Sequence, residues 1–464
     1  SRRQRQMCIR DRGATTARYI AEGGKEVLVV DRRDPIGSPL QCGELVPTND
    51  EMRRLCPNVP DVDDLLQTPP HAISRQTTEM YIVPPSGKPL RYPFDGYMLD
   101  RVAHDEALVE LAKEKGATFL TDARVASVEG NDVHLRDGRV LTAKIIVGAG
   151  GHNDPLRKAY WDETSLKIPI KFVLMDGEFG DAVELHFGSM APGGYAWMFP
   201  KGRGANIGLG VQKKFCKEKN LNELTDDFIA RYDGDITFTG AGSLPMSGTI
   251  RTFVKGNYVL VGDAAGMVLP SNGAGITIAM VGGRIAGQVI VEHLNDGTPL
   301  SEYEVRWKKQ MGKFIKNYKR ALKLGSTLMR MPDWFINMVF NRFTKTFVLR
   351  SISCRNLFFL FYTVYSTHRL TVVKTGFRVL ATDLSGIPTF YISSSSLRPP
   401  WVKKKYARDC LPRLASGLRR FVRTVVPTRS TVVSRQVSGF YSATKISHPS
   451  HHGQTTPVVV FTHG

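Results

Sequence analysis

The chain has 464 residues and a formal net charge of +20, and 42% of its residues are hydrophobic. This length allows a large buried core and leads us to expect two domains, while the apolar content excludes a mainly disordered chain. The six cysteines are scattered without a Cys-x-x-Cys pair, so we expect no metal site and a reducing compartment. No apolar run reaches the ~20 residues of a membrane span.

The positive charge is concentrated at the two ends of the chain. Residues 393–464 carry +11 and residues 1–12 carry +4, which leaves +5 for the body. Neither end shows an apolar period, and the first segment lacks the apolar core of a signal peptide. We therefore expect 1–12 to be foreign sequence and 393–464 to be a disordered or non-native tail. Genuine basic arms remain the alternative.

The first predicted elements match the second half of a dinucleotide-binding unit, a pattern that is weak evidence by itself. A helix of small residues is predicted over 13–23, and an apolar strand over 25–31 ends at Asp31. An acid in this place binds ribose hydroxyls in such units. The strand and the Gly-x-Gly-x-x-Gly turn that normally precede the helix are absent, with Gly13 standing where the third glycine would fall.

An irregular loop is predicted at 34–47, because three prolines and two glycines disfavour regular structure there. It carries Cys42, and a lone cysteine is more often structural than functional. Strands are predicted over 73–83 and 89–92. The 3.6-residue period of 102–115 predicts a helix, with Arg101 at its start as either a phosphate ligand or a solvated charge.

Further along, short strands are predicted over 118–120, 123–129, 132–136, 140–142 and 144–149. Alternating apolar residues from 167 to 247 predict a second, mostly antiparallel sheet. Tyr195, Trp197 and Phe199 alternate, so they line one face of it, either as core or as the wall of a binding site. Beyond 301 the chain is helical, basic and rich in aromatic residues, which suits either a membrane surface or a helical cap.

The most informative stretch runs from 259 to 287. It predicts a buried strand, a sharp turn at Gly262-Asp263, a glycine-rich loop and a helix that begins near Ile276. Small residues let a backbone approach a ligand, and a helix N-terminus offers unpaired N–H groups. The stretch is therefore either a nucleotide or flavin cradle or a tight strand–helix crossover.

The order of these motifs resembles the geranylgeranyl reductase family of flavoproteins, within the group similar to p-hydroxybenzoate hydroxylase. The resemblance covers about residue 13 to the 370s and is carried by Ser38-Pro39-Leu40-Gln41-Cys42-Gly43-Glu44, Leu99-Asp100-Arg101, Tyr195-Ala196-Trp197-Met198-Phe199-Pro200 and residues 262–275. It departs from the family in the missing first strand, and in Gly150-Gly151 where the group usually has Asp-Gly.

The resemblance implies an α/β fold with a doubly wound, Rossmann-like FAD-binding domain, an interleaved antiparallel substrate domain and C-terminal helices. The FAD-binding domain would comprise 13–165 and 248–300, the substrate domain 73–98 and 166–247, and the helical region 301–375. The implied FAD-binding residues are Gly13, Ala14, Asp31, Arg32, Cys42, Gly43, Arg101, Val125, Gly262, Asp263, Gly273, Gly275 and Ile276. Cys42, Gly43 and Glu44 would lie at the reaction centre, and Tyr195, Trp197, Phe199 and Pro200 would contact the substrate.

The implied activity is FAD-dependent reduction of C=C bonds in geranylgeranyl chains, most directly those of archaeal diether lipids. The electron donor is not readable from the sequence and could be NAD(P)H, ferredoxin or a reduced deazaflavin. The partners expected are an isoprenoid lipid and the cytoplasmic face of a membrane, with a peripheral, monomeric protein and no nucleic acid. Alternatives are a flavin-dependent aromatic monooxygenase of the same fold and a non-enzymatic basic membrane or nucleic-acid binder.

Overall fold

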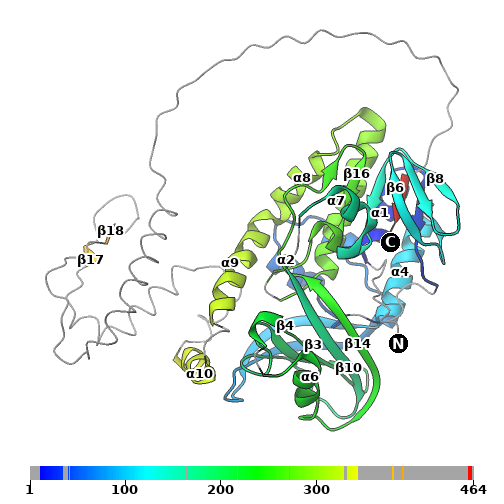
Figure 1. Cartoon of the computed structure of the whole chain (residues 1–464). Coiled ribbons are helices and arrows are strands. Elements are labelled where there is room, and N and C mark those ends of the chain that lie inside the picture. The colour runs from blue at the N-terminus through cyan, green and yellow to red at the C-terminus, as the bar shows by residue number, and fades with distance from the viewer. Residues whose placement is uncertain are drawn as a thin grey trace, which may run out of the picture. The chain divides into compact units, whose positions relative to one another are not determined.

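The computed structural model describes residues 11–34, 40, 42–163, 166–216, 218–270, 272–328, 332–342, 379–380, 389–390 and 458–461. The chain divides into two compact units, residues 1–356 with 454–464, and residues 357–453. In the second unit, the described residues are one antiparallel pair, β17 (Val379–Leu380) with β18 (Thr389–Phe390). The first unit contains the sheets and helices described below (Figure 1).

A six-stranded, mainly parallel sheet forms the centre of the dinucleotide-binding domain. Its strand order is β15 (Val254–Lys255), β16 (Tyr258–Leu260), β9 (Ile146–Gly148), β19 (Val458–Phe461), β1 (Val27–Val30) and β5 (Thr118–Leu120). Only the edge strand β15 is antiparallel to its neighbour. The strands read as continuous apolar runs because both faces of a parallel sheet are covered.

The central position of this sheet is filled by β19, from the C-terminal part of the chain. Its four residues are at most 1% exposed, and Val460 pairs in parallel with both Val29 and Val147. Without a strand between them, the facing edges of β1 and β9 would leave rows of N–H and C=O groups unpaired. The backbone of β19 pairs with these groups, and its three valines favour the extended conformation that this requires. β19 thus occupies the central position that the missing first strand would fill. Residues 393–464 were expected to lie outside the fold, and for Val458–Phe461 this expectation is wrong.

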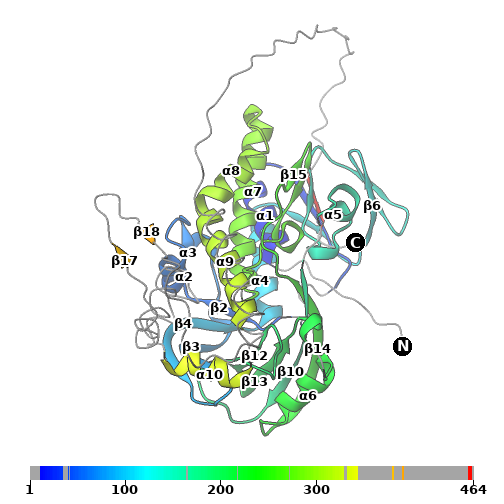
Figure 2. The same ribbon diagram turned by 60° about the vertical axis from the view of Figure 1, so that its left-hand side comes forward.

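Helix α1 (Asp11–Glu22) lies against α7 (Ile276–Asp296) on one face of this sheet (Figure 2). The helix includes Asp11 and Arg12, so these two residues are not outside the fold as expected for the segment 1–12. A Cβ on Gly287 would lie 2.7 Å from Cβ of Tyr19. Glycine therefore permits the close approach of the two helices.

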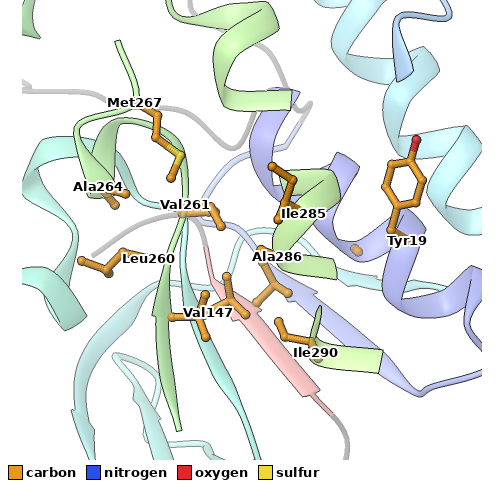
Figure 3. Close-up of a cluster of buried hydrophobic side chains, with 14 of the residues drawn as sticks. Tyr19, Val147, Leu260, Val261, Ala264, Met267, Ile285, Ala286 and Ile290 are labelled. Carbon is orange, nitrogen blue, oxygen red and sulfur yellow. The ribbon is translucent and has the colours of Figure 1, made fainter. Parts of the chain in front are cut away.

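The apolar core of this domain lies between the sheet and these helices. Figure 3 shows Val147 of β9 and Val261, directly after β16, on the side of the sheet that faces Ile285 and Ile290 of α7. All four are at most 1% exposed. The strand, turn, loop and helix predicted for 259–287 are present, and the helix begins at Ile276 as predicted.

The second domain is built on an eight-stranded sheet. Its order is β14 (Asp235–Pro245), β10 (Lys167–Asp176), β13 (Gly204–Gly210), β12 (Tyr195–Lys201), β11 (Val183–His186), β3 (Ile73–Val83), β4 (Leu90–Leu99) and β2 (Leu45–Pro47). All neighbours are antiparallel except β11 and β3, which pair in parallel. The predicted α/β fold with an interleaved antiparallel sheet is confirmed.

Smaller elements complete the described chain. A three-stranded meander contains β6 (Val125–Glu129), β7 (Asp132–Leu135) and β8 (Val140–Thr142). No helix within the described ranges is long and apolar enough to cross a membrane. Residues 343–375 of the expected C-terminal helical region lie outside the described residues. The other helices are α2 (Asn49–Leu55), α3 (Val62–Leu65), α4 (Arg101–Glu114), α5 (Pro155–Tyr160), α6 (Leu221–Ile229), α8 (Glu302–Trp307), α9 (Lys313–Leu328) and α10 (Asp333–Arg342), with a π-helical turn at Lys308–Gly312.

Candidate active site

Three parallel strands end at the same edge of the six-stranded sheet and bring separate motifs together. β1 leads into Asp31, β9 into Ala149, and β16 into the turn Gly262–Ala265. The Asp31 carboxylate is buried, and its Oδ1 accepts a hydrogen bond from the Arg33 N–H at 2.8 Å. Ligands of α/β folds bind outside the carboxyl ends of the strands, so this edge is the candidate site.

The Gly262–Asp263 turn is partly covered by Arg12 from α1. Gly262 has a positive φ of 59°, and a Cβ added there would lie 2.1 Å from Cδ of Arg12. Arg12 Nη1 lies 2.5 Å from Asp263 Oδ1, and its Nε donates to the Ala149 carbonyl at 3.1 Å. The guanidinium therefore joins the ends of β9 and β16 across the predicted cradle.

The glycine-rich loop carries the chain from this turn to α7. Gly273 has a φ of 74°, and Gly275 precedes α7 without a side-chain cap. A Cβ on Gly275 would lie 3.8 Å from Asp263 Oδ1, which places the start of α7 beside that carboxylate. The first N–H groups of the helix are thus directed at the candidate site.

Arg101, at the first turn of α4, points into the protein rather than into solvent. It is 2% exposed, its Nη2 lies 2.6 Å from Asp105 Oδ1, and Asp11 Oδ1 lies 3.9 Å away. Burial lowers the pKa of Arg101, but Asp105 and Asp11 outweigh that effect and raise it. Burial also raises the pKa of Asp11, against the charges of Arg101 and Arg12.

Two nitrogens of this buried guanidinium, Nε and Nη1 of Arg101, have no hydrogen-bond partner among the described residues. Leaving such donors unpaired in the interior is unfavourable, so they mark a place for an anionic or polar ligand. Of the two alternatives for Arg101, the structure excludes the solvated charge.

Cys42 lies on the loop before β2, half-buried. Its Sγ accepts a hydrogen bond from the Glu44 N–H at 3.2 Å. Gly43 packs on the aromatic stripe, because a Cβ there would lie 3.1 Å from Cε2 of Phe199. Burial raises the pKa of Tyr195, and the charge of Cys42 adds to this increase.

Tyr195, Trp197 and Phe199 form one stripe along β12, as the alternation predicts. Trp197 stacks on Phe199 with centroids 6.1 Å apart, and Tyr195 lies 6.0 Å from Trp197. Tyr195 Oη donates to the Asn272 carbonyl at 2.5 Å, which ties the stripe to the glycine-rich loop. Trp197 and Phe199 also belong to an apolar cluster, so core and wall are compatible roles.

Other predicted site residues occupy the flanks of this arrangement. Gly13 and Ala14 lie in the first turn of α1, and Arg32 follows Asp31. Val125 is buried in β6 as part of the domain core, and Pro200 falls on the sheet face opposite Trp197. The prediction missed Arg12, Asp105, Lys201, Asn206 and Asn272. The Arg101–Asp105 spacing of four on a helix could have indicated Asp105.

A buried carboxylate, Asp154, supports the Gly150-Gly151 turn, where the sequence departs from the pattern of the family it resembles. It accepts hydrogen bonds from Gly150 N–H at 2.6 Å and Arg157 N–H at 3.0 Å. Burial raises its pKa to about 6, although these hydrogen bonds and the Arg12 charge act in the opposite direction.

This pKa predicts a pH dependence of stability. Between about pH 4 and 6 the unfolded chain loses the Asp154 proton while the folded chain keeps it, so stability falls as pH rises, by roughly 3 kcal/mol in total. Urea unfolding at pH 4, 5, 6 and 7 is the measurement. The difference between wild type and Asp154→Asn should change across this window and be constant above it. A difference independent of pH would contradict the assignment.

Comparisons with solved structures identify the class of this fold. A geranylgeranyl bacteriochlorophyll reductase-like protein from Thermoplasma acidophilum superposes with a TM-score of 0.66 at 24% identity, covering 77% of this chain and 96% of that one. PqsL, a probable FAD-dependent monooxygenase from Pseudomonas aeruginosa, gives 0.54 at 16% identity, covering 72% and 98%. The fold is the one shared by this reductase-like protein and the probable FAD-dependent monooxygenase.

Sequence comparisons give the family within this class. A model of the geranylgeranyl reductase catalytic domain matches residues 167–241. Digeranylgeranylglycerophospholipid reductase 1 of Methanococcoides burtonii is 32% identical, covering 66% of this chain and 79% of its own length. Reductase 2 of Methanothermobacter thermautotrophicus is 32% identical, covering 69% and 86%. The chain belongs to the geranylgeranyl reductase family, a family of flavin-dependent oxidoreductases.

The residues at the strand ends fit the FAD that this fold group binds. The unpaired Arg101 nitrogens suit a phosphate, the open start of α7 suits polar ring atoms, and Asp31 suits a ribose. Arg12 is the exception, since its side chain covers Gly262 and engages Asp263. Within the described residues, no group of three His, Cys, Asp or Glu side chains is arranged to hold a metal.

Proposed function

We propose that this protein is an FAD-dependent reductase that saturates C=C bonds of geranylgeranyl chains, most directly those of archaeal membrane diether lipids. The observation that carries the proposal is the aromatic stripe of β12. It reaches from the glycine-rich loop, through Tyr195 and Asn272, to the Cys42 loop, through Phe199 and Gly43. An apolar chain laid along it would lie between the flavin-side loop and a thiol.

The binding roles follow from position and chemistry. Arg101 binds a phosphate through Nε and Nη1, Asp31 binds ribose hydroxyls, and Asp263 binds the sugar-alcohol side of the cofactor. Gly273 and Gly275 would let the backbone approach the ring, because neither residue carries a Cβ. Reduced FAD supplies a hydride to one carbon of the double bond.

The chain's own contribution is orientation, exclusion of water and proton supply. An unactivated C=C bond has no charge to recognise, so the substrate is oriented by shape against Tyr195, Trp197 and Phe199. The Cys42 thiol, whose Sγ accepts the Glu44 N–H beside the aromatic stripe, would supply the proton for the second carbon. Donation leaves a thiolate, which the positive charge of Arg101 stabilises.

The Arg12 side chain should weaken cofactor binding. Releasing Asp263 and uncovering Gly262 by Arg12→Ala is expected to tighten FAD binding by about tenfold, the equivalent of one hydrogen bond to a charged group. The matched control is Arg18→Ala, which removes another buried arginine of α1 that pairs with Asp64. Quenching of FAD fluorescence measures both. Weaker binding in Arg12→Ala would instead make Arg12 a phosphate ligand.

The proposal includes peripheral attachment to the cytoplasmic face of a membrane as a monomer. α9 carries exposed basic side chains at Lys313, Lys316 and Arg320. Each basic residue near an anionic surface contributes about 1 kcal/mol. On α10, Trp334 and Met338 are 67% and 42% exposed and one turn apart, which suits insertion at the headgroup level.

The test is single-turnover reduction under anaerobic conditions. FAD-loaded protein, reduced chemically with dithionite, is mixed with a geranylgeranyl diether lipid, and the lipid is analysed by mass spectrometry. Gain of two hydrogens per double bond supports the proposal, and Trp197→Ala should lose most of that yield. An unchanged lipid, or oxygen uptake coupled to a hydroxylated aromatic product, would refute it and favour the monooxygenase. The electron donor is then sought among NAD(P)H, ferredoxin and reduced deazaflavin.

A further inference from the structure

Glu44, two residues after Cys42, is a fully buried carboxylate in an unusual backbone conformation. It is 0% exposed and has a φ of 68°, a region that residues with a Cβ rarely adopt. Its carbonyl accepts the Leu99 N–H of β4 at 3.0 Å, so its backbone is anchored to the sheet. The surrounding contacts must maintain this conformation, because it is unfavourable by itself.

Two side chains hold the Glu44 carboxylate, one from the end of β12 and one from β13. Lys201 Nζ, at the end of β12, lies 2.5 Å from Glu44 Oε1, and Asn206 Nδ2, on β13, donates to Oε2 at 3.1 Å. The same Asn206 Nδ2 donates to the Cys42 carbonyl at 3.0 Å. Asn206 Oδ1 in turn accepts the Trp197 indole N–H at 2.9 Å.

We infer that Lys201 and Asn206 are positioning residues, which act through Glu44 to hold the Cys42 thiol beside the aromatic stripe. The inference rests on the proposed function for the role of Cys42. Glu44 would then position the Cys42 loop and would not contact the substrate, because both of its carboxylate oxygens bind Lys201 and Asn206. One amide thereby links the thiol loop, the buried carboxylate and the substrate-contacting indole.

The buried carboxylate of Glu44 makes the contacts of Lys201 and Asn206 with the Cys42 loop, here called the Glu44 network, testable by a change of pH. Burial raises the pKa of Glu44, while Lys201, Asn206 and then Arg101 lower it. These three residues, from β12, β13 and α4, are the groups that face the carboxylate. Without Lys201, an ionised Glu44 is poorly compensated, and the loop must move outward to hydrate it. A protonated Glu44 is neutral and can stay inside.

The experiment measures alkylation of Cys42 by iodoacetamide in the full chain without added FAD. Peptide mass spectrometry compares the labelling of Cys42 with that of Cys216, which serves as an internal reference. Cys216 is half-buried and packs on the face of the eight-stranded sheet opposite the aromatic stripe. Lys201→Met removes the charge and keeps the stem. The matched control is Lys171→Met, because Lys171 also forms one ion pair, with Asp226, and its side chain is 18% exposed against 19% for Lys201.

The expected result is a Cys42-to-Cys216 ratio at least about fivefold above wild type in Lys201→Met, growing as pH rises from 6 to 9. Lys171→Met should match wild type at every pH, and Lys201→Arg should restore the wild-type ratio. Asn206→Ala should raise the ratio without this pH dependence, because Lys201 still compensates Glu44.

A ratio within twofold of wild type in Lys201→Met, with unchanged circular dichroism, would overturn the inference. So would an equal rise in Lys171→Met. The labelling needs no reductase activity, so it separates this inference from the proposed function. If labelling follows the expectation but no lipid is reduced, the network stands and the reductase proposal fails.

Discussion

Replacing Val460 by Asp is expected to abolish cooperative folding of the dinucleotide-binding domain. Val460 is 0% exposed in the centre of the parallel sheet, between Val29 and Val147. A carboxylate there has no cation to pair with among its apolar sheet neighbours, and its burial is unfavourable by several kcal/mol. A domain is stabilised by only about 5–15 kcal/mol, so this loss is comparable to the whole.

The measurement is urea unfolding followed by circular dichroism, with limited proteolysis of the same samples. Val460→Ala should remain folded but lose about 2–3 kcal/mol, through two lost methyl groups and a cavity. Val305→Asp is the control, since Val305 is 55% exposed on α8 and the change should be nearly neutral. Wild-type stability in Val460→Asp would show that β19 is not the central strand.

Arg101→Met is expected to remove most FAD binding and to destabilise the protein as well. Charge-assisted hydrogen bonds contribute about 1.5–3 kcal/mol each, so losing both free nitrogens should weaken FAD binding by at least about 100-fold. The change also leaves the buried carboxylates of Asp105 and Asp11 without their cation. Breaking a buried pair in this way lowers the free energy of unfolding by about 3–5 kcal/mol.

Two further variants separate these effects. Arg101→Lys keeps the charge, so it should recover most of the stability but only part of the FAD affinity, because a lysine cannot reproduce the two-nitrogen fork. Arg306→Met removes a more exposed arginine that pairs with Glu292, and it should change stability by less than about 1 kcal/mol. FAD affinity by fluorescence and stability by urea unfolding are measured on each. Stability lost with FAD affinity intact would make Arg101 purely structural.

Local patterns predicted many elements closely. The strands over 118–120 and 140–142 have the predicted bounds, and the helix predicted over 102–115 runs from 101 to 114. Polar–apolar alternation correctly placed Trp197 and Phe199 on one face of β12. These successes share a cause, because period and turn chemistry act between residues a few positions apart. The family itself was also identified from short motifs.

Contacts between distant segments were not predicted. Arg12 was assigned to foreign sequence because its neighbours lack an apolar period, yet it is 7% exposed and pairs with Asp263. Lys201 and Asn206 looked like ordinary strand residues until Glu44 was placed between them. No local rule indicates which lysine or amide will meet a carboxylate 157 or 162 positions earlier.

The sequence by itself determined the class of this protein: two interleaved sheets, a turn at Gly262-Asp263 leading to a glycine-rich loop, and an aromatic stripe beside a cysteine loop. Only the tertiary structure decided which strand fills the centre of the parallel sheet and which side chains bind the buried carboxylate of Glu44. The physical reason is that an open parallel sheet and a buried carboxylate both require partners without specifying where in the chain these lie. Val458–Phe461 satisfies the first requirement, and Lys201 with Asn206 satisfies the second.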